Sequence, residues 1–336
     1  MNDIRLWDII RSGISGDIVL LGFPHDQGVE INGGRIGARL GPENFRSWLQ
    51  GFGTIHNPER DIDLSALSIA DAGDIPAEIP LPTAHTRLTQ KVGSILEKGG
   101  IPFVVGGGND QSYPNVSALL HHHEGNPVGV INVDAHLDVR PLKDGRAHSG
   151  SSFRLLLEDN RFKGENFIEF AAQGSQCSEE HAEYVRRKNG RILWLDDIQK
   201  QGPAVDSFKA SLGDLAADCS SLFVSFDLDS IAGSDAPGVS CPGVLGLSAR
   251  DAISIAWQSG LHPLVSLFDL SEYNPAIEDE RTGRLAAGMF YYFCLGVASR
   301  KEMNDPGASG LGIRQGFLFK SRSKLRSMKP TGGNQK

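Results

Sequence analysis

The residues best suited to chemistry lie in one short segment, Asp134-Ala135-His136-Leu137-Asp138, which follows an apolar run ending at Val133. Alternate residues of an extended segment point to the same side of the chain. Two carboxylates and one imidazole on that side would leave excess negative charge, and a divalent cation is the natural partner for such a charge. The pattern therefore indicates a metal site, although a polar loop could have the same composition.

A second pair of carboxylates, Asp227 and Asp229, follows another apolar run, Leu222–Phe226. The combined set of four carboxylates and one imidazole suits hard cations such as Mn²⁺ or Mg²⁺ better than structural zinc. It is large enough for two ions, which together can activate a water and clamp a substrate. A third apolar run, Pro102–Val105, ends in Gly106–Asp110 (GGGND), where glycines would let the backbone approach a ligand; no phosphate-binding G-x-x-x-x-G-K-[ST] pattern follows.

The elements that must position these residues are short apolar runs alternating with amphipathic stretches. Such runs are typical of strands buried on both faces of a parallel sheet. The eight candidate strands are Asp17–Phe23, Leu67–Ala70, Pro102–Val105, Gly129–Val133, Asn166–Ala171, Arg191–Leu195, Leu222–Phe226 and Leu264–Phe268. Helices are predicted over Thr83–Glu97 and after two N-cap candidates, Ser178 and Ser248. The alternation predicts one doubly wound α/β sheet of about eight strands, whose active site gathers beyond the carboxyl ends of the strands.

Composition narrows the class of protein. The 336 residues contain 33 Lys and Arg against 41 Asp and Glu, a net charge of −8. Seven basic residues and no acidic one lie between Arg314 and Lys336, so the rest of the chain is more acidic still, and we expect no nucleic-acid surface on it. The longest apolar run, Met289–Ala298, is too short to span a membrane, and the charged N-terminus lacks the core of a signal peptide. Four widely spaced cysteines form no disulfide framework, and a cytoplasmic location is the expectation. We predict a single catalytic domain over residues 1–319 and a basic, flexible tail over residues 320–336.

The three polar segments resemble, in order and spacing, the metal motifs of the ureohydrolase superfamily, which includes arginase, agmatinase and formimidoylglutamase. Further segments also resemble family motifs: Gly37–Pro42 (GARLGP), Asp71–Asp74 (DAGD), Ala236–Gly243 (APGVSCPG) and Asp269–Pro275 (DLSEYNP). The resemblance extends from about residue 20 to about residue 300 and implies a three-layer α/β/α arginase-like fold, with a central, mainly parallel sheet.

The same resemblance implies two Mn²⁺ ions per chain, bridged by a hydroxide. By position, one ion would be held by Asn109, Asp134, Asp138 and Asp227, and the other by Asp134, His136, Asp227 and Asp229. Asn109 departs from the family, which usually has histidine there. Its neutral amide oxygen is a weaker ligand for a hard cation. Asn109 could ligate weakly, a water could replace it, or that ion could be largely absent; we expect reduced affinity at this site.

The reaction implied by the resemblance is attack of the bridging hydroxide on the sp² carbon of an amidine or guanidine, followed by loss of an amine. By position, Glu272 would anchor the cationic head of the substrate, and Asp138 could pass a proton to the departing amine. His148 resembles the proton-relay histidine of the family, unless it is a surface histidine of its loop.

The segment after Asp138 indicates the substrate. It lacks the S-G-N-x-H-G run typical of arginases and resembles the formimidoylglutamase D-x-R…S-G-x-x-F-R pattern. N-formimidoyl-L-glutamate carries two carboxylates, which arginine can grip with paired hydrogen bonds. Arg140 and Arg154 are the predicted substrate-binding cations, although Arg140 could instead pair with an internal Asp. The predicted reaction is manganese-dependent hydrolysis to L-glutamate and formamide, a step of histidine degradation.

Two other interpretations are kept. The chain could have another ureohydrolase activity, namely that of an agmatinase, guanidinobutyrase or arginase. It could also be a metal-poor arginase-like protein that binds or regulates, a hypothesis suggested by Asn109. The predicted partner is a small-molecule substrate, with neither nucleic acid nor membrane, and family analogy favours a homo-oligomer, either a trimer or a hexamer.

Overall fold

A computed structural model describes residues 4–304 and contains a nine-stranded sheet whose neighbouring strands all pair in parallel. In spatial order the strands are β1 (Ile10–Ser12), β5 (Ile69–Asp74), β2 (Ile18–Phe23), β6 (Ile101–Gly106), β11 (Val265–Ser271), β10 (Ser221–Asp227), β7 (Val128–Val133), β8 (Phe167–Ala172) and β9 (Arg191–Trp194). A separate antiparallel pair joins β3 (His56–Asn57) to β4 (Ile62–Asp63). The order places β6, β11, β10 and β7 side by side at the centre of the sheet.

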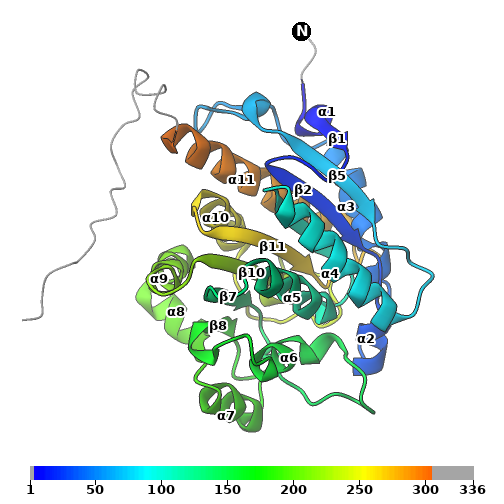
Figure 1. Cartoon of the computed structure of the whole chain (residues 1–336), viewed down its shortest axis with the longest axis vertical. Helices are drawn as coiled ribbons and strands as arrows, with labels where there is room; N and C mark the ends of the chain where they lie inside the picture. The colour runs from blue at the N-terminus through cyan, green and yellow to red at the C-terminus, as the bar shows by residue number, and fades with distance from the viewer. Residues whose placement is uncertain (1–3, 305–336) are drawn as a thin grey trace, which may run out of the picture.

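Helices cover both faces of the sheet and make three layers (Figure 1). One face packs against α4 (Leu81–Glu97), α5 (Ser112–His122), α6 (Ser152–Glu158) and α7 (Glu179–Arg187). The other face packs against α1 (Leu6–Ile9), α3 (Gly41–Gln50), α8 (Leu195–Gln201), α9 (Ala204–Ala216), α10 (Ala249–Leu261) and α11 (Glu280–Asn304). A short helix, α2 (Gln27–Asn32), follows β2.

Alternation along the strands explains why the core has two halves. In β2, Ile18 and Leu20 belong to the apolar cluster on one face, whereas Val19, Leu21 and Phe23 belong to the cluster on the other. Successive side chains of a strand point to opposite faces, so a strand covered by helices on both sides must be apolar throughout. All six residues of β2 are accordingly buried.

The arginase-like α/β/α architecture predicted from sequence is confirmed, with nine strands in the main sheet where about eight were expected. Each of the eight predicted runs overlaps one strand. The additional strand is β1, which has three partly or fully exposed residues and lies at the edge of the sheet, so it has no apolar run to reveal it.

The predicted helix starts are also present. The Ser248 hydroxyl accepts a hydrogen bond from the backbone N–H of Asp251, and the Asp251 carboxylate accepts one from the backbone N–H of Ser248. Together these two bonds form a capping box at α10. The Ser178 hydroxyl accepts from the His181 N–H at the start of α7. Such caps satisfy backbone donors that a helix leaves unpaired at its first turn.

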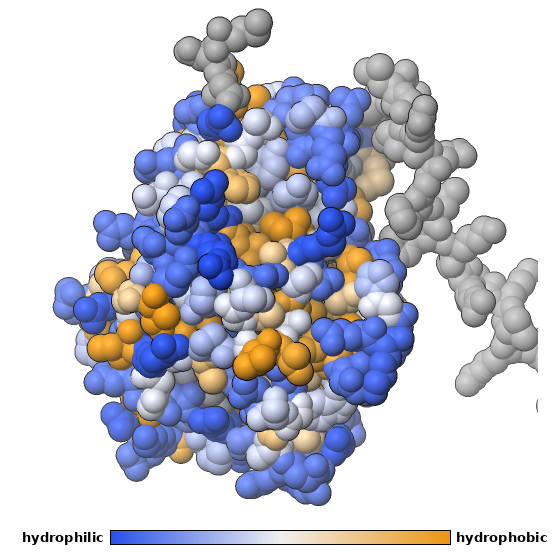
Figure 2. Space-filling view, turned by 180° about the vertical axis from the view of Figure 1, so that it is seen from behind, coloured by the Kyte–Doolittle hydropathy of each residue, from blue (hydrophilic) through white to orange (hydrophobic). Residues whose placement is uncertain are grey.

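The predicted end of the domain at residue 319 and the basic tail lie outside the described residues. Between residues 4 and 304, no helix is long and apolar enough to cross a membrane. The face opposite to that of Figure 1 is mainly hydrophilic, with apolar residues gathered in several separate patches (Figure 2).

Candidate metal centre and active site

The carboxyl ends of the four central strands carry the residues predicted for the site. Asn109 follows β6 and begins a short 3-10 helix, Asn109–Gln111. Asp227 ends β10, and Asp229 lies in the next 3-10 helix, Leu228–Ser230. Asp134, His136 and Asp138 follow β7, and Glu272 follows β11. Because these strands are parallel neighbours, their ends meet at one edge of the sheet, where the crevice of an open α/β sheet lies.

The carboxylates converge into two groups that share Asp134. Ligand atoms of Asp134, His136 and Asp229 lie within 4.8 Å of one another, and so do those of Asp134, Asp138 and Asp227. Asp134, Asp227 and Asp229 are buried. We call these five residues the acidic cup. Each group offers three ligand atoms, so the acidic cup has room for two cations.

The electrostatics of the acidic cup favour the binding of a cation. Burial, and then the charge of Asp134, raise the pKa of Asp138 well above its usual range. Burial and the charge of Asp229 do the same to the pKa of Asp227. The charge of Asp229 also raises the pKa of His136, whose Nδ1 lies 3.2 Å from the Asp229 carboxylate and 3.3 Å from that of Asp134.

Two buried carboxylate oxygens, Asp229 Oδ1 in the acidic cup and Glu272 Oε2 beside it, have no hydrogen-bond partner. A buried oxygen without a partner is costly, so such atoms require an explanation. Oxygen-rich donor sets suit Mn²⁺ and Mg²⁺. The residues present therefore fit a pair of hard divalent cations.

The amide of Asn109 already donates to the acidic cup. Its Nδ2 lies 2.7 Å from Asp138 Oδ2 and 3.4 Å from Asp134 Oδ2, so it supplies the partial positive charge that a cation would supply. Its Oδ1 accepts hydrogen bonds from the hydroxyls of Ser112, at 2.6 Å, and Ser271, at 3.2 Å. A half-turn of the amide would exchange the two ends and aim the oxygen at the carboxylates. Asn109 can thus serve as a ligand only in the second orientation.

Two of the six non-glycine residues that have a positive φ between residues 4 and 304 lie at the same edge. Asp138 and Glu272 are non-glycine residues with φ of 44° and 65°. Such conformations persist only where the surrounding structure imposes them, and they gather at functional sites. The Asp138 carbonyl accepts from the Phe153 N–H at 3.1 Å, and the Glu272 N–H donates to the Gly107 carbonyl at 2.7 Å. A Cβ at Gly107 would lie 1.8 Å from the His25 carbonyl oxygen, so only glycine fits in this loop.

A cavity of about 180 Å³ opens above the acidic cup. Its floor includes His136, Asp138, Asp227, Asp229 and Glu272, and its rim is formed by Asn32, Gly33, Gly34, Arg140, Ser149, Ser240 and Cys241. An Arg140 N–H donates to Asn32 Oδ1 at 3.0 Å, so this guanidinium is held at the rim and has donors left for a ligand. The cavity therefore combines an anionic floor with one cation at its mouth.

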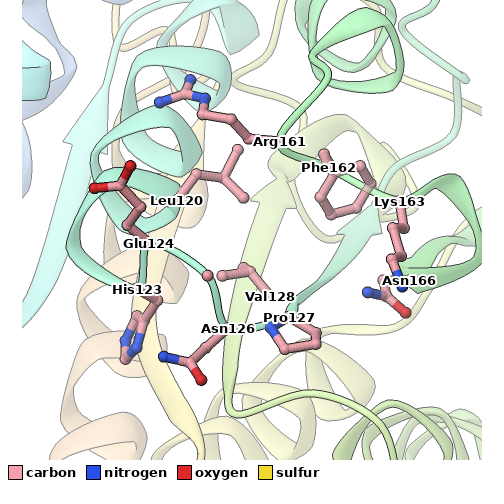
Figure 3. Close-up of a pocket in the computed structure, with 11 residues that line it drawn as sticks. Leu120, His123, Glu124, Asn126, Pro127, Val128, Arg161, Phe162, Lys163 and Asn166 are labelled. Atoms are coloured by element: carbon pink, nitrogen blue, oxygen red, sulfur yellow. The ribbon is translucent and has the colours of Figure 1, made fainter.

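A second cavity, of about 330 Å³, lies where β7 begins, away from the carboxyl ends of the strands (Figure 3). Glu124 is the only acidic residue among those that line it, and its other polar groups include Asn126, Lys163 and Asn166. Size alone does not locate the reaction, because this larger cavity lacks a cluster of carboxylates.

Two residues predicted for the site lie away from the cavity. Arg154 on α6 places its Nε 3.1 Å from the Glu158 carboxylate and its guanidinium 4.5 Å from the centre of the Tyr184 ring. His148 is buried, so it is not a surface histidine. Its Nε2 lies 3.0 Å from the Pro141 carbonyl, and its Nδ1 accepts from the Gly150 N–H at 3.2 Å. Both ring nitrogens thus hold the loop together, and burial lowers the pKa of His148.

Sequence reasoning missed several residues of the site. Asn32, Ser149 and Ser240 line the cavity, and Ser112 and Ser271 hold the Asn109 amide. The pair of glycines after Asn32 was a usable signal, since it indicates backbone close to a ligand. Ser240 and Ser271 lie in segments that resemble family motifs, but their residue type alone did not assign them to the site, and Ser271 contacts Asn109 across 162 positions.

Comparisons with known proteins agree with this geometry. The model of the arginase family matches residues 16–296. Formimidoylglutamase of Aromatoleum aromaticum is 30% identical over 297 residues, which is 84% of each chain, and that of Hahella chejuensis is 32% identical over 282 residues, covering 80% of this chain and 82% of the relative. The crystal structure of Trypanosoma cruzi formiminoglutamase with Mn²⁺ is 48% identical, with a TM-score of 0.85 over 89% of this chain and 100% of that one. Since the family model covers most of its length, this chain belongs to the arginase family.

Proposed function

We propose that this protein hydrolyses N-formimidoyl-L-glutamate to L-glutamate and formamide with two Mn²⁺ ions, as a step of histidine degradation. The observation that carries the proposal is the cavity itself, which four of the five acidic-cup residues line together with a single arginine at the rim. The relatives named formimidoylglutamase and the Mn²⁺ in the Trypanosoma cruzi structure support it. That the chain is cytoplasmic and forms a homo-oligomer stays a prediction from the family resemblance.

Asp134, His136, Asp138, Asp227 and Asp229 of the acidic cup would hold the two ions, and Asn109 would complete one site in its oxygen-inward orientation. When bound, the ions would lower the pKa of a water and so supply the nucleophile that amidine hydrolysis needs. We expect the ion beside Asn109 to bind more weakly than the other, because a neutral amide is a poorer ligand than a charged one.

Glu272 would anchor the cationic formimino group. Its Oε1 accepts from the Asn109 N–H at 3.2 Å, which leaves the buried Oε2 without a partner beside the cavity. Burial raises the pKa of Glu272 well above its usual range. A cationic substrate head reverses that effect, since an opposite charge favours the ionised carboxylate. Binding therefore selects substrates that bring a positive charge.

Hydrolysis adds water across the formimino carbon and breaks its bond to the glutamate nitrogen, which must gain a proton as it leaves. Asp138 lies on the cavity floor, where it could take a proton from the attacking water and pass it to that nitrogen. His148 remains the predicted source of further proton transfer, although its two ring nitrogens are engaged in the loop.

Arg140 explains the preference among amidines and guanidines. Formimidoylglutamate has two carboxylates, and a guanidinium at the rim can bind one of them with two parallel hydrogen bonds. Agmatine has no carboxylate and would gain nothing from this contact. Arg154 would contribute only if it left its contacts with Glu158 and Tyr184.

A substrate panel tests the proposal. Protein stripped of metal and reloaded with Mn²⁺ is assayed with formimidoylglutamate, arginine, agmatine and guanidinobutyrate, and the released formamide or urea is measured. We expect turnover of formimidoylglutamate alone, and none before Mn²⁺ is added. Turnover of arginine or agmatine with formimidoylglutamate left intact would refute the assigned substrate.

A further inference from the structure

The hydroxyl of Ser112 lies between the Asn109 amide and a carboxylate that no step of the proposed reaction uses. Ser112 Oγ is 2.6 Å from Asn109 Oδ1 and 3.1 Å from Oδ2 of Asp269, a residue of β11. The Ser225 hydroxyl lies 3.0 Å from the same oxygen of Ser112. A chain of hydrogen bonds thus leads from Asp269 to the acidic cup.

This series of hydrogen bonds is buried away from solvent. Asn109, Ser112, Ser225 and Asp269 are all buried. Besides Ser112, Asp269 Oδ2 accepts from Asn115 Nδ2 at 2.8 Å, whereas Asp269 Oδ1 has no hydrogen-bond partner. Each hydrogen bond to a buried carboxylate stabilises it, so Asp269 competes with Asn109 for the Ser112 proton.

Ser112 has one hydroxyl proton and can give it to only one acceptor at a time. If the proton goes to Asn109 Oδ1, the amide keeps its Nδ2 towards the acidic cup. If the proton goes to Asp269, a lone pair of Ser112 faces Asn109, and the amide must present Nδ2 to it. The amide oxygen then points at the carboxylates, which is the orientation in which it can ligate a cation.

Ser271 is compatible with both arrangements. Its hydroxyl lies 3.2 Å from Asn109 Oδ1 and 3.3 Å from Asp227 Oδ2. It can donate to the amide oxygen, or it can turn its proton to Asp227 and accept from the amide nitrogen. The choice is therefore left to Ser112 and Asp269.

We propose that Asp269 is a positioning residue that takes the Ser112 proton and thereby turns the oxygen of Asn109 towards the metal centre. This inference rests on the proposed two-ion centre. It says that Asp269 sets the Mn²⁺ affinity of the weaker of the two sites. Burial raises the pKa of Asp269 to about 7, against the hydrogen bonds from Asn115 and the two serines. At pH 8 the ionised, proton-accepting form predominates.

The test is a Mn²⁺ titration at pH 8, in which the electron paramagnetic resonance signal of free Mn²⁺ reports binding without substrate. The variants are Asp269→Leu, Asn109→Ala and the double variant. We expect Asp269→Leu to weaken one of the two ions by about tenfold or more, as substitutions behind metal ligands commonly do, and to leave the other unchanged. In the Asn109→Ala background, Asp269→Leu should cause no further loss.

Asp269→Asn is the conservative control, which keeps an acceptor for Ser112 and Asn115 but removes the charge. It should weaken the same ion by a smaller factor, and it takes the place of Asp269→Leu in the cycle if the leucine variant does not fold. Unchanged affinity for both ions in both variants would overturn the inference, and so would an equal loss with and without the Asn109 amide. A protein that binds two ions and leaves formimidoylglutamate intact would refute the substrate only.

Discussion

Removing one carboxylate from the acidic cup should change stability and metal binding in opposite directions. The perturbation is Asp227→Asn, measured at pH 8. The amide oxygen of asparagine can keep the hydrogen bond that Asp227 Oδ1 accepts from the Asp229 N–H at 2.9 Å, so the substitution removes mainly a charge. In the metal-free protein that charge repels its neighbours, whereas in the loaded protein it binds the ions.

The structure sets the scale of the effect. Asp227 shares a group with Asp134 and Asp138 whose ligand atoms lie within 4.8 Å of one another. At that separation and an effective dielectric constant of about 20, each pair of full charges repels by about 3.5 kcal/mol. Proton uptake relieves much of this repulsion, because the pKa values of Asp138 and Asp227 are raised. We therefore expect a net stabilisation of about 1–3 kcal/mol, which is a rise in Tm of roughly 1–4 °C for a chain of this size.

The assay is thermal unfolding in EDTA, followed by circular dichroism, together with a Mn²⁺ titration of the same variant. Asp71→Asn is the matched control, because Asp71 pairs with Arg46 at 2.7 Å and its loss should lower Tm. Asp227→Asn should raise Tm without metal and weaken Mn²⁺ binding by well over tenfold. If it lowers Tm as Asp71→Asn does, the carboxylates do not form a mutually repelling cluster, and the reasoning fails.

Three further predictions concern pH and the substrate. The metal-free protein should lose stability as pH rises from 5 to 8.5, because Asp138, Glu272 and His136 keep protons in the folded chain that the unfolded chain has released. Thermal melts in EDTA and in Mn²⁺ across this pH range check the prediction, and Mn²⁺ should raise the stability most at pH 8.5. Arg140→Gln should raise KM for formimidoylglutamate about tenfold or more in a steady-state assay, with a smaller change in kcat. Arg154→Gln is the matched control away from the cavity, and it should change KM less than twofold in the same assay. Glu272→Gln should lower kcat/KM by about a hundredfold or more, since a charged hydrogen bond contributes about 1.5–3 kcal/mol, while the two-ion stoichiometry in a Mn²⁺ titration stays the same.

The fold was largely predictable because a sheet covered on both faces needs strands that are apolar throughout. That requirement is met by β2, β6, β7, β8 and β10, which are buried at every residue, and only in part by β5 and β9. It does not reveal β1, whose residues are partly exposed at the edge. Nor does it give the order of the strands, and the adjacency of β6, β11, β10 and β7 is what brings the site together.

The carboxylates of the site were predictable because each follows a buried strand directly. Residues that depend on loop conformation were not. Arg154 lies in the segment that resembles a substrate-binding pattern, yet α6 carries its side chain to Tyr184, a residue thirty positions later. The orientation of Asn109 depends on Ser271, which is 162 positions away. Contacts between residues so far apart cannot be predicted from the local sequence around either residue.

The most direct test of the two-ion centre is anomalous diffraction from crystals of the Mn²⁺-loaded protein, with elemental analysis of the same sample. The account predicts two manganese ions per chain, both in contact with Asp134, one on the side of His136 and the other on the side of Asp138. A loaded crystal with no manganese at the acidic cup, or with its ions elsewhere in the molecule, would contradict it.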